Sequence, residues 1–239
     1  MPAIQFGLCA VLMALSAVGG TASRDAMEVL NRRCIRFTPE DFIDLVKRGD
    51  AENVQVFLQA GMDPNTGLET GKPALFIAVQ KGLREMAKVL VDGGAMVNYK
   101  GPKGWTALQF ACMLGYRDIA EILLGKGADP NTQNDLGVTA LHLAVQERDL
   151  PFVETLVKHG ADVHLKSRCG ANALIIALET EQPVIITFFE KSGYAGEMKA
   201  LRQKIRMELA GQAKEEQQRE LERRRKLRQE MSAATGKNL

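Results

Sequence analysis

The chain has 239 residues, of which 46% are hydrophobic and 25% are charged, and its formal net charge at pH 7 is +2. This is the profile of an ordinary soluble globular or repeat protein. A net charge so close to zero does not suggest a strongly basic protein that binds nucleic acid through its overall charge.

Residues 1–22 carry no charged side chain and are apolar from about Phe6 to Val18. That apolar run is too short to cross a bilayer comfortably, but it has the length of the central segment of a secretory signal. Gly20 and Ala22 place small residues where signal peptidase cleaves, so we predict cleavage after Ala22 and a periplasmic or secreted protein. The usual Lys or Arg before the apolar run is missing, which leaves open an uncleaved helix that tethers the protein to a membrane, or a cytoplasmic protein.

Residues 23–37 follow the signal segment and contain apolar residues at helical spacing, Met27, Leu30 and Cys34. Repeat arrays expose an apolar face at each end of the stack, and a helix with a polar outer side can cover it. We therefore predict an N-terminal capping helix here.

A period of 33 residues organises the chain from residue 38 to residue 194. The anchors of this period are leucines, with a phenylalanine in the same phase before them: Phe42, Leu75, Leu108, Leu141 and Leu174. Around them the sequence repeats as GKPALFIAV, GWTALQFAC, GVTALHLAV and GANALIIAL, and each copy is followed later by a segment such as GKGADPN or KHGADVH. Each unit reads as two short helices, which are marginal alone, so the units must stack on one another.

This pattern of T-x-L-H-x-A followed by G-A-D-x-N at a period of 33 resembles the ankyrin repeat. The resemblance covers about Thr38 to Tyr194 as five units. It implies an all-α solenoid of helix-turn-helix units joined by hairpin loops, called fingers. Thr106 and Thr139 stand where a side-chain oxygen can accept a hydrogen bond from the first helical turn, and Thr38 precedes a proline at the first helical position.

The units depart from the family pattern at the turn between their two helices. The first three have the usual glycine there, Gly49, Gly82 and Gly115, but the last two have Arg148 and Glu181. Glycine is the residue that adopts a left-handed backbone most readily. We therefore expect the last two units to turn less regularly.

The resemblance also implies a binding surface on the inner, concave face, formed by finger residues before the threonine and by two residues near the end of the first helix. In the third unit these positions are Pro102, Lys103, Trp105, Met113 and Leu114, and in the fourth they are Asp135, Leu136, Val138, Gln146 and Glu147. The only tryptophan thus lies beside Met113 and Leu114, and such clusters resemble the anchors of protein interfaces. The alternative for Trp105 is that its ring folds back over its own finger.

The composition changes after Tyr194. In residues 195–211 the apolar residues recur at helical spacing, which predicts a helix that docks on the last repeat: Met198, Leu201, Ile205 and Leu209. In residues 212–239, glutamates placed four residues before Lys or Arg predict a solvated charged helix with a frayed end. A basic arm for nucleic acid or anionic lipid is the alternative, which the interleaved glutamates and the lack of aromatic rings disfavour.

No catalytic motif is present: there is no G-x-S-x-G, no phosphate-binding glycine loop, no HExxH and no CxxC. His142 occupies the histidine position of the ankyrin motif and is expected to be a structural hydrogen-bonding residue. His159 and His164 lie near Cys169, but without a spaced second pair of ligands they do not indicate a metal site. We therefore predict no enzymatic activity, no cofactor and no metal.

Removal of the signal would leave three cysteines, Cys34, Cys112 and Cys169. Cys112 falls at a core position of a first helix. Cys34 and Cys169 belong to opposite ends of the solenoid, so a bridge between them is sterically disfavoured. Either these thiols stay free or Cys169 joins the protein to another molecule.

We interpret the chain as a monomeric, non-catalytic scaffold that binds a partner protein on the concave face in an exported compartment, with no nucleic acid and no stable membrane insertion. Two alternatives stay open: an ankyrin effector that acts on host proteins, and a thiol-dependent redox protein that uses Cys169.

Overall fold

The computed structural model describes residues 21–67 and 73–235, so nearly all of the predicted signal segment, residues 1–22, lies outside the described residues. Within these ranges the regular elements are helices, apart from one isolated bridge between Gly67 and Pro73. The all-α prediction is therefore confirmed. The chain forms two compact units, the first ending at Ile176 and the second beginning at Ala177.

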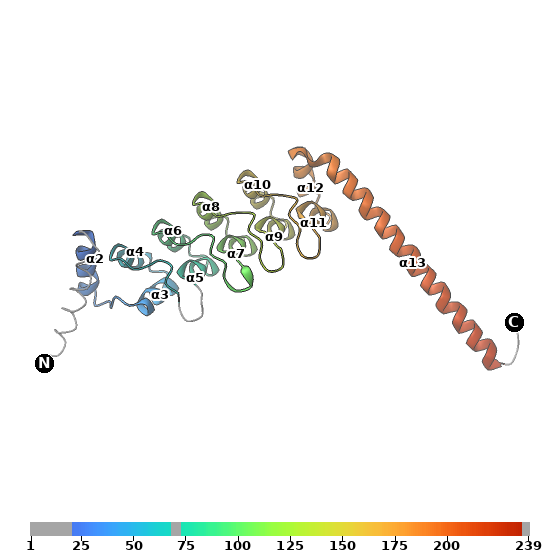
Figure 1. Cartoon of the computed structure of the whole chain (residues 1–239), viewed down its shortest axis with the longest axis horizontal. Coiled ribbons are helices and arrows are strands. Elements are labelled where there is room, and N and C mark those ends of the chain that lie inside the picture. Colours follow the sequence, from blue (N-terminus) through green and yellow to red (C-terminus); the bar gives the residue numbers. More distant parts are fainter. Residues whose placement is uncertain (1–20, 68–72, 236–239) are drawn as a thin grey trace. The chain divides into compact units, whose positions relative to one another are not determined.

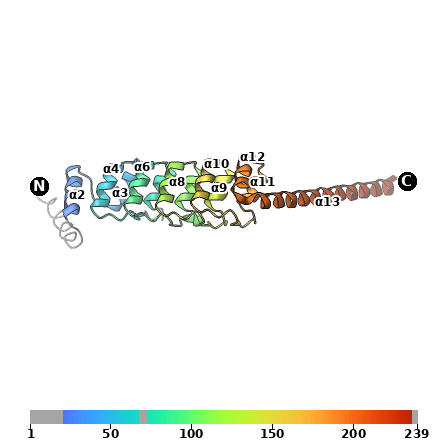
Figure 2. The ribbon, with the colours of Figure 1, turned by 90° about the horizontal axis from the view of Figure 1, so that it is seen from above.

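The first unit consists of short helices in chain order: α2 (Thr21–Arg32), α3 (Pro39–Arg48), α4 (Ala51–Gln59), α5 (Ala74–Gln80), α6 (Arg84–Asp92), the 3-10 turn η1 (Pro102–Gly104), α7 (Ala107–Met113), α8 (Arg117–Gly125), α9 (Ala140–Gln146), α10 (Leu150–Lys158) and the start of α11 (Ala173–Glu179). Each first helix pairs with the helix that follows it, as α7 does with α8. First helices also pack on first helices and second helices on second helices, which gives the two rows seen in Figure 1. Figure 2 views the stack from above, with the short helices side by side along it. The finger loops project on the side of the first-helix row (Figure 1).

The 33-residue period places its anchor residues in the core. Phe42, Leu75, Leu108, Leu141 and Leu174 are all at most 1% exposed. The alanines three residues later, Ala78, Ala111 and Ala144, are fully buried, which allows successive first helices to approach closely. Burial of one such leucine contributes roughly 1.5–3 kcal/mol, and this gain offsets the cost of ordering helices that are unstable alone.

Threonine caps begin α3, α7 and α9, as predicted. The hydroxyl oxygen of Thr106 accepts the Gln109 backbone N–H (3.3 Å), and the Gln109 side-chain oxygen accepts the Thr106 backbone N–H (3.1 Å). This reciprocal pair is a capping box. The Thr38 hydroxyl accepts the Asp41 N–H in the same way (3.2 Å), and Asn172 replaces the missing threonine before α11 by accepting the Ile175 N–H (3.0 Å).

The expectation of less regular turns in the last two repeats is wrong. Arg148 has φ 60° and Glu181 has φ 49°, which is the left-handed conformation of Gly49, Gly82 and Gly115. The hydrogen bond after the turn is also kept, because Asp149 N–H donates to Ala144 O (3.0 Å) as Tyr116 N–H donates to Ala111 O (2.9 Å). A residue with a Cβ costs about 1 kcal/mol more than glycine in this conformation, and the repeat geometry imposes it nonetheless.

Helix α2 packs against α4 and buries Ala26, Met27 and Leu30, as expected of a helix that covers the first repeat. The prediction that Cys34 belongs to the same buried helical face is wrong. The helix ends at Arg32, and Cys34 is an exposed residue in a left-handed turn (φ 57°).

The second unit contains the end of α11, α12 (Pro183–Phe189), the short π-helix η2 (Glu190–Tyr194) and α13 (Ala195–Thr235). A single helix thus covers both C-terminal segments that the sequence divided near Gly211. Met198 is fully buried and α13 packs against α12 and η2, but Leu209 is already 60% exposed. The packing therefore involves only the first turns of α13, and from residue 206 to residue 226 its side chains are exposed.

Candidate protein-binding surface

The fingers of the third, fourth and fifth repeats are joined by backbone hydrogen bonds at their tips. Asp135 N–H donates to Lys103 O (3.1 Å), and Arg168 N–H donates to Leu136 O (2.9 Å). The Gln133 side chain adds a bond to Lys166 O (2.9 Å) in the next finger. These bonds hold the predicted finger residues in a fixed array.

Two glycines allow this close approach of the fingers. Gly104 and Gly137 both have φ +71°, and an added Cβ on Gly137 would lie 3.0 Å from the backbone nitrogen of Arg168. An added Cβ on Gly104 would lie 3.0 Å from the backbone nitrogen of Asp135. A side chain at either position would force neighbouring fingers apart.

Asparagines fix the base of each finger to the next. The Asn98 side chain accepts Asp129 N–H (2.8 Å) and donates to Gly127 O (3.0 Å). Asn131 repeats this arrangement one unit later, accepting Asp162 N–H (2.7 Å) and donating to Gly160 O (3.0 Å). The fingers are thus supported at both base and tip.

We call the surface formed by the first helices and fingers of the first unit the inner face. On it, Leu136 is 59% exposed, Met113 39% and Leu114 41%. The remaining predicted residues are exposed, namely Pro102, Lys103, Asp135, Gln146 and Glu147, or half-buried, namely Trp105 and Val138. Because α7 packs against α9 and the two fingers are bonded to each other, the third- and fourth-repeat residues belong to adjacent elements.

The Trp105 ring lies against the ring of Phe110 in its own repeat, with centroids 5.1 Å apart. Phe110 in turn meets the buried Phe76 edge to face at 5.8 Å, and Phe76 meets Tyr99 at 5.7 Å. Trp105 is therefore in part a packing residue, as the alternative interpretation held, although it stays half-buried.

Phe110 is a surface residue that the sequence reasoning missed. It belongs to a row of apolar residues spaced by 33: Ile77, Phe110, Leu143 and Ile176. Leu143 is only 9% exposed, and the other three are half-buried. On α7 it shares a face with Met113 and Leu114, three and four residues later. The sequence contains the pattern that could have identified it, because every one of these repeats has a large apolar residue directly after the position of His142.

His142 has the predicted structural role. Its Nδ1 accepts the Thr139 backbone N–H (3.1 Å), and its Nε2–H donates to Ala171 O (3.1 Å). Burial of the ring lowers the pKa of His142, which keeps the neutral form. Gln109 makes the equivalent bonds one repeat earlier, where its amide donates to Thr132 O (2.9 Å) and Val138 O (2.8 Å).

The described residues contain no group of His, Cys, Asp or Glu that could hold a metal ion. Cys112 is buried, as predicted, and burial raises the pKa of its thiol, so this thiol is poorly suited to act as a nucleophile. Cys169 is exposed in the fifth finger, with the Ser167 hydroxyl oxygen 2.9 Å from its sulfur.

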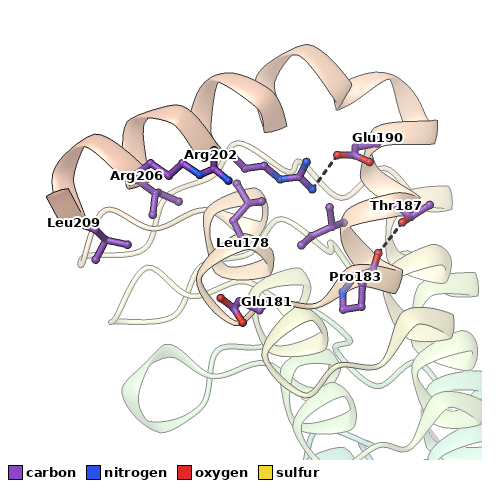
Figure 3. Close-up of a pocket in the computed structure, with 10 residues that line it drawn as sticks. Leu178, Glu181, Pro183, Thr187, Glu190, Arg202, Arg206 and Leu209 are labelled. Carbon is purple, nitrogen blue, oxygen red and sulfur yellow. Dashed lines mark hydrogen bonds and ion pairs between the residues drawn. The ribbon is translucent and has the colours of Figure 1, made fainter.

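A groove of about 470 Å³ in the second unit lies beside the start of α13 (Figure 3). Its apolar lining comes from Leu178, Ile186, Ile205 and Leu209, and Arg202 bridges to Glu190 (3.1 Å). Two guanidinium groups and two carboxylates line it, so its charges balance and do not select a ligand.

None of the helices in the described ranges combines the length and the apolar character needed to cross a bilayer. Two family models match the chain: one described as ankyrin repeats in three copies covers residues 42–134, and one described as ankyrin repeats in many copies covers residues 115–177. A search of curated proteins found no match.

Proposed function

Because the chain belongs to the ankyrin-repeat family, we propose that it is a non-catalytic scaffold that binds a partner protein on the inner face of its third and fourth repeats. The observation that carries this proposal is the exposure of three large apolar side chains outside the buried core, Met113, Leu114 and Leu136. Apolar side chains gathered on one face, with polar residues around them, are typical of interface anchors.

The support beneath these residues favours binding as well. Finger-tip and finger-base hydrogen bonds fix the backbone of Lys103 and Leu136, and the Phe110 ring restrains Trp105. A side chain that is already ordered loses little conformational entropy when a partner docks, whereas each mobile side chain loses roughly 0.5–1.5 kcal/mol. The finger part of this surface should therefore lose less conformational entropy on binding than an unsupported loop would.

The proposal can be tested with a double variant, Met113→Glu with Leu114→Glu. A partner is first identified by capture from the native cells, and its affinity for purified wild-type and variant protein is then measured. We expect the affinity to fall by about 30-fold or more, on the order of 2 kcal/mol, because two anchors become charged. Thermal unfolding should change little, since both side chains are exposed.

The matched control is Val184→Glu, which places a charge on another exposed apolar residue, 60% exposed on α12. The control should retain wild-type affinity. Equal loss in both variants, or wild-type affinity in the double variant, would show that the inner face is not the binding site.

We also propose that the protein works in an exported compartment. Support comes from the apolar run from Phe6 to Val18 and the small residues Gly20 and Ala22. Export predicts that protein purified from its own cells begins at or near Ser23. Intact-mass measurement of the soluble protein tests this, and retention of residues 1–22 would contradict it.

A further inference from the structure

The exposed ends of the first helices change charge from one repeat to the next. This gradient indicates the kind of partner, an inference that rests on the proposed function. Two adjacent positions recur every 33 residues at these ends: Lys47 and Arg48, Gln80 and Lys81, Met113 and Leu114, Gln146 and Glu147. All of these side chains are exposed except the half-buried Gln80. The row is therefore basic in the first two repeats, apolar in the third and acidic in the fourth.

The basic end keeps an excess of positive charge. Arg48 is paired with Asp44 at 2.5 Å, so these two charges offset each other. The Lys81 ammonium donates to the backbone carbonyl of Lys47 (2.7 Å), and a neutral acceptor leaves the positive charge in place. Two lysines, Lys47 and Lys81, thus set the sign of this end.

The acidic end is set by Glu147, the exposed residue directly after α9. Arg148 follows it but stands in the left-handed turn, at the position of Gly115, and so lies outside the row. The finger tips do not share the gradient, because their charges alternate as Lys103, Asp135 and Arg168. Among the described residues of these three fingers the charges do not segregate, so the polarity belongs to the helix ends.

We propose that the partner presents to the inner face an amphipathic helix that is acidic toward the first two repeats, apolar at the third and basic toward the fourth. Neighbouring first helices lie about 10 Å apart, so three steps span about 30 Å, the length of roughly 20 helical residues. An extended peptide fits less well, because finger backbone groups such as Asp135 N–H and Lys103 O are already bonded to each other and offer no sheet edge.

A displayed library of 20-residue helical peptides, with one apolar face and randomised charged positions, tests this on the full chain. We expect the enriched peptides to carry Asp and Glu at one end and Lys and Arg at the other. Enriched peptides with mixed charges would overturn the proposal, and so would a selection that enriches no peptide.

The affinity of the best peptide is then measured for wild-type protein and for the double variant Lys47→Glu with Lys81→Glu. We expect binding about tenfold weaker at low salt, with recovery when the acidic end of the peptide is changed to lysine. Lys88→Glu, on the second helix α6, is the matched control and should leave affinity unchanged. Unchanged affinity in the Lys47 and Lys81 variant would overturn the proposal.

The Met113→Glu, Leu114→Glu variant separates this proposal from the proposed function. If the selected peptides bind the variant less tightly than wild type but show no segregation of charge, the binding face is supported and only the proposed polarity is refuted. Peptides that bind it as well as wild type refute the binding face too.

Discussion

Replacement of His142 by glutamine should remove a pH dependence from the stability of the solenoid. In the folded protein, Nδ1 of the neutral ring accepts the Thr139 N–H and Nε2–H donates to Ala171 O. Protonation would place a positive charge on a buried ring, so the folded state resists it. The pKa of His142 is accordingly lowered by burial.

The sign and size follow from proton linkage. A lowered pKa in the folded state means that the unfolded chain binds more protons below about pH 6.5, so stability is full above this pH and is lost as the pH falls. A single such group can lower the free energy of unfolding by at most about 1.4 kcal/mol per pH unit. The loss continues until the pH reaches the lowered pKa of the folded state.

Gln109 shows that glutamine can do the same structural work, since it accepts Thr106 N–H and donates to two finger carbonyls. His142→Gln should therefore be within about 1 kcal/mol of wild type at pH 8. Denaturant unfolding between pH 8 and pH 5 should show a shallower decline for the variant than for wild type. The reciprocal change, Gln109→His, should make the free energy of unfolding decline more steeply as the pH falls.

Two results would refute this reasoning. His142→Gln could keep the full wild-type decline, or Gln109→His could add none. Either would show that protonation at this repeat position is not coupled to unfolding.

Three further changes test the packing. Leu141→Ala should lower the free energy of unfolding by about 2–5 kcal/mol, because it leaves a cavity in the core. Truncation after Gly211 should change the melting temperature little. Equal losses of stability would contradict the division into packed repeats and an exposed helix. Arg148→Gly should raise the free energy of unfolding by about 0.5–1 kcal/mol in denaturant titrations, because glycine adopts the left-handed backbone without strain. The greater entropy of glycine in the unfolded chain offsets part of this gain. A loss of stability would contradict the strain argument. Gly137→Ala should lower it by about 1–3 kcal/mol, because its Cβ would meet the Ser167 and Arg168 backbone; wild-type stability would contradict the close finger contact.

The repeat core could be predicted from the sequence because the constraint is periodic. Each anchor such as Leu108 occurs with the same neighbours at the same spacing, so burial in one repeat implies burial in all. The turn at Arg148 could not be predicted in this way. Local preference argues against a left-handed arginine, and the stacking of the repeats on both sides overrides that preference.

The surface was harder to predict than the core. The resemblance to the ankyrin repeat was enough to identify Met113 and Leu114 as exposed, because in that fold these two helix positions point to the inner face. It could not show that Trp105 lies on Phe110, since that contact depends on the path of a finger held by its neighbours. The sequence divides the C-terminal segment near Gly211. In the structure, packing ends near Leu209 within one continuous helix, so the division marks a change in environment.

Site-specific photo-crosslinking tests the central claim most directly. A photoreactive residue is placed at position 114 on the inner face or at position 121, an exposed residue of the second helix α8, and each protein is irradiated in its own cells. We predict that a partner protein is crosslinked from Leu114 and not from Glu121. Crosslinks from Glu121 alone, or equal yields from both, would contradict a binding site on the inner face.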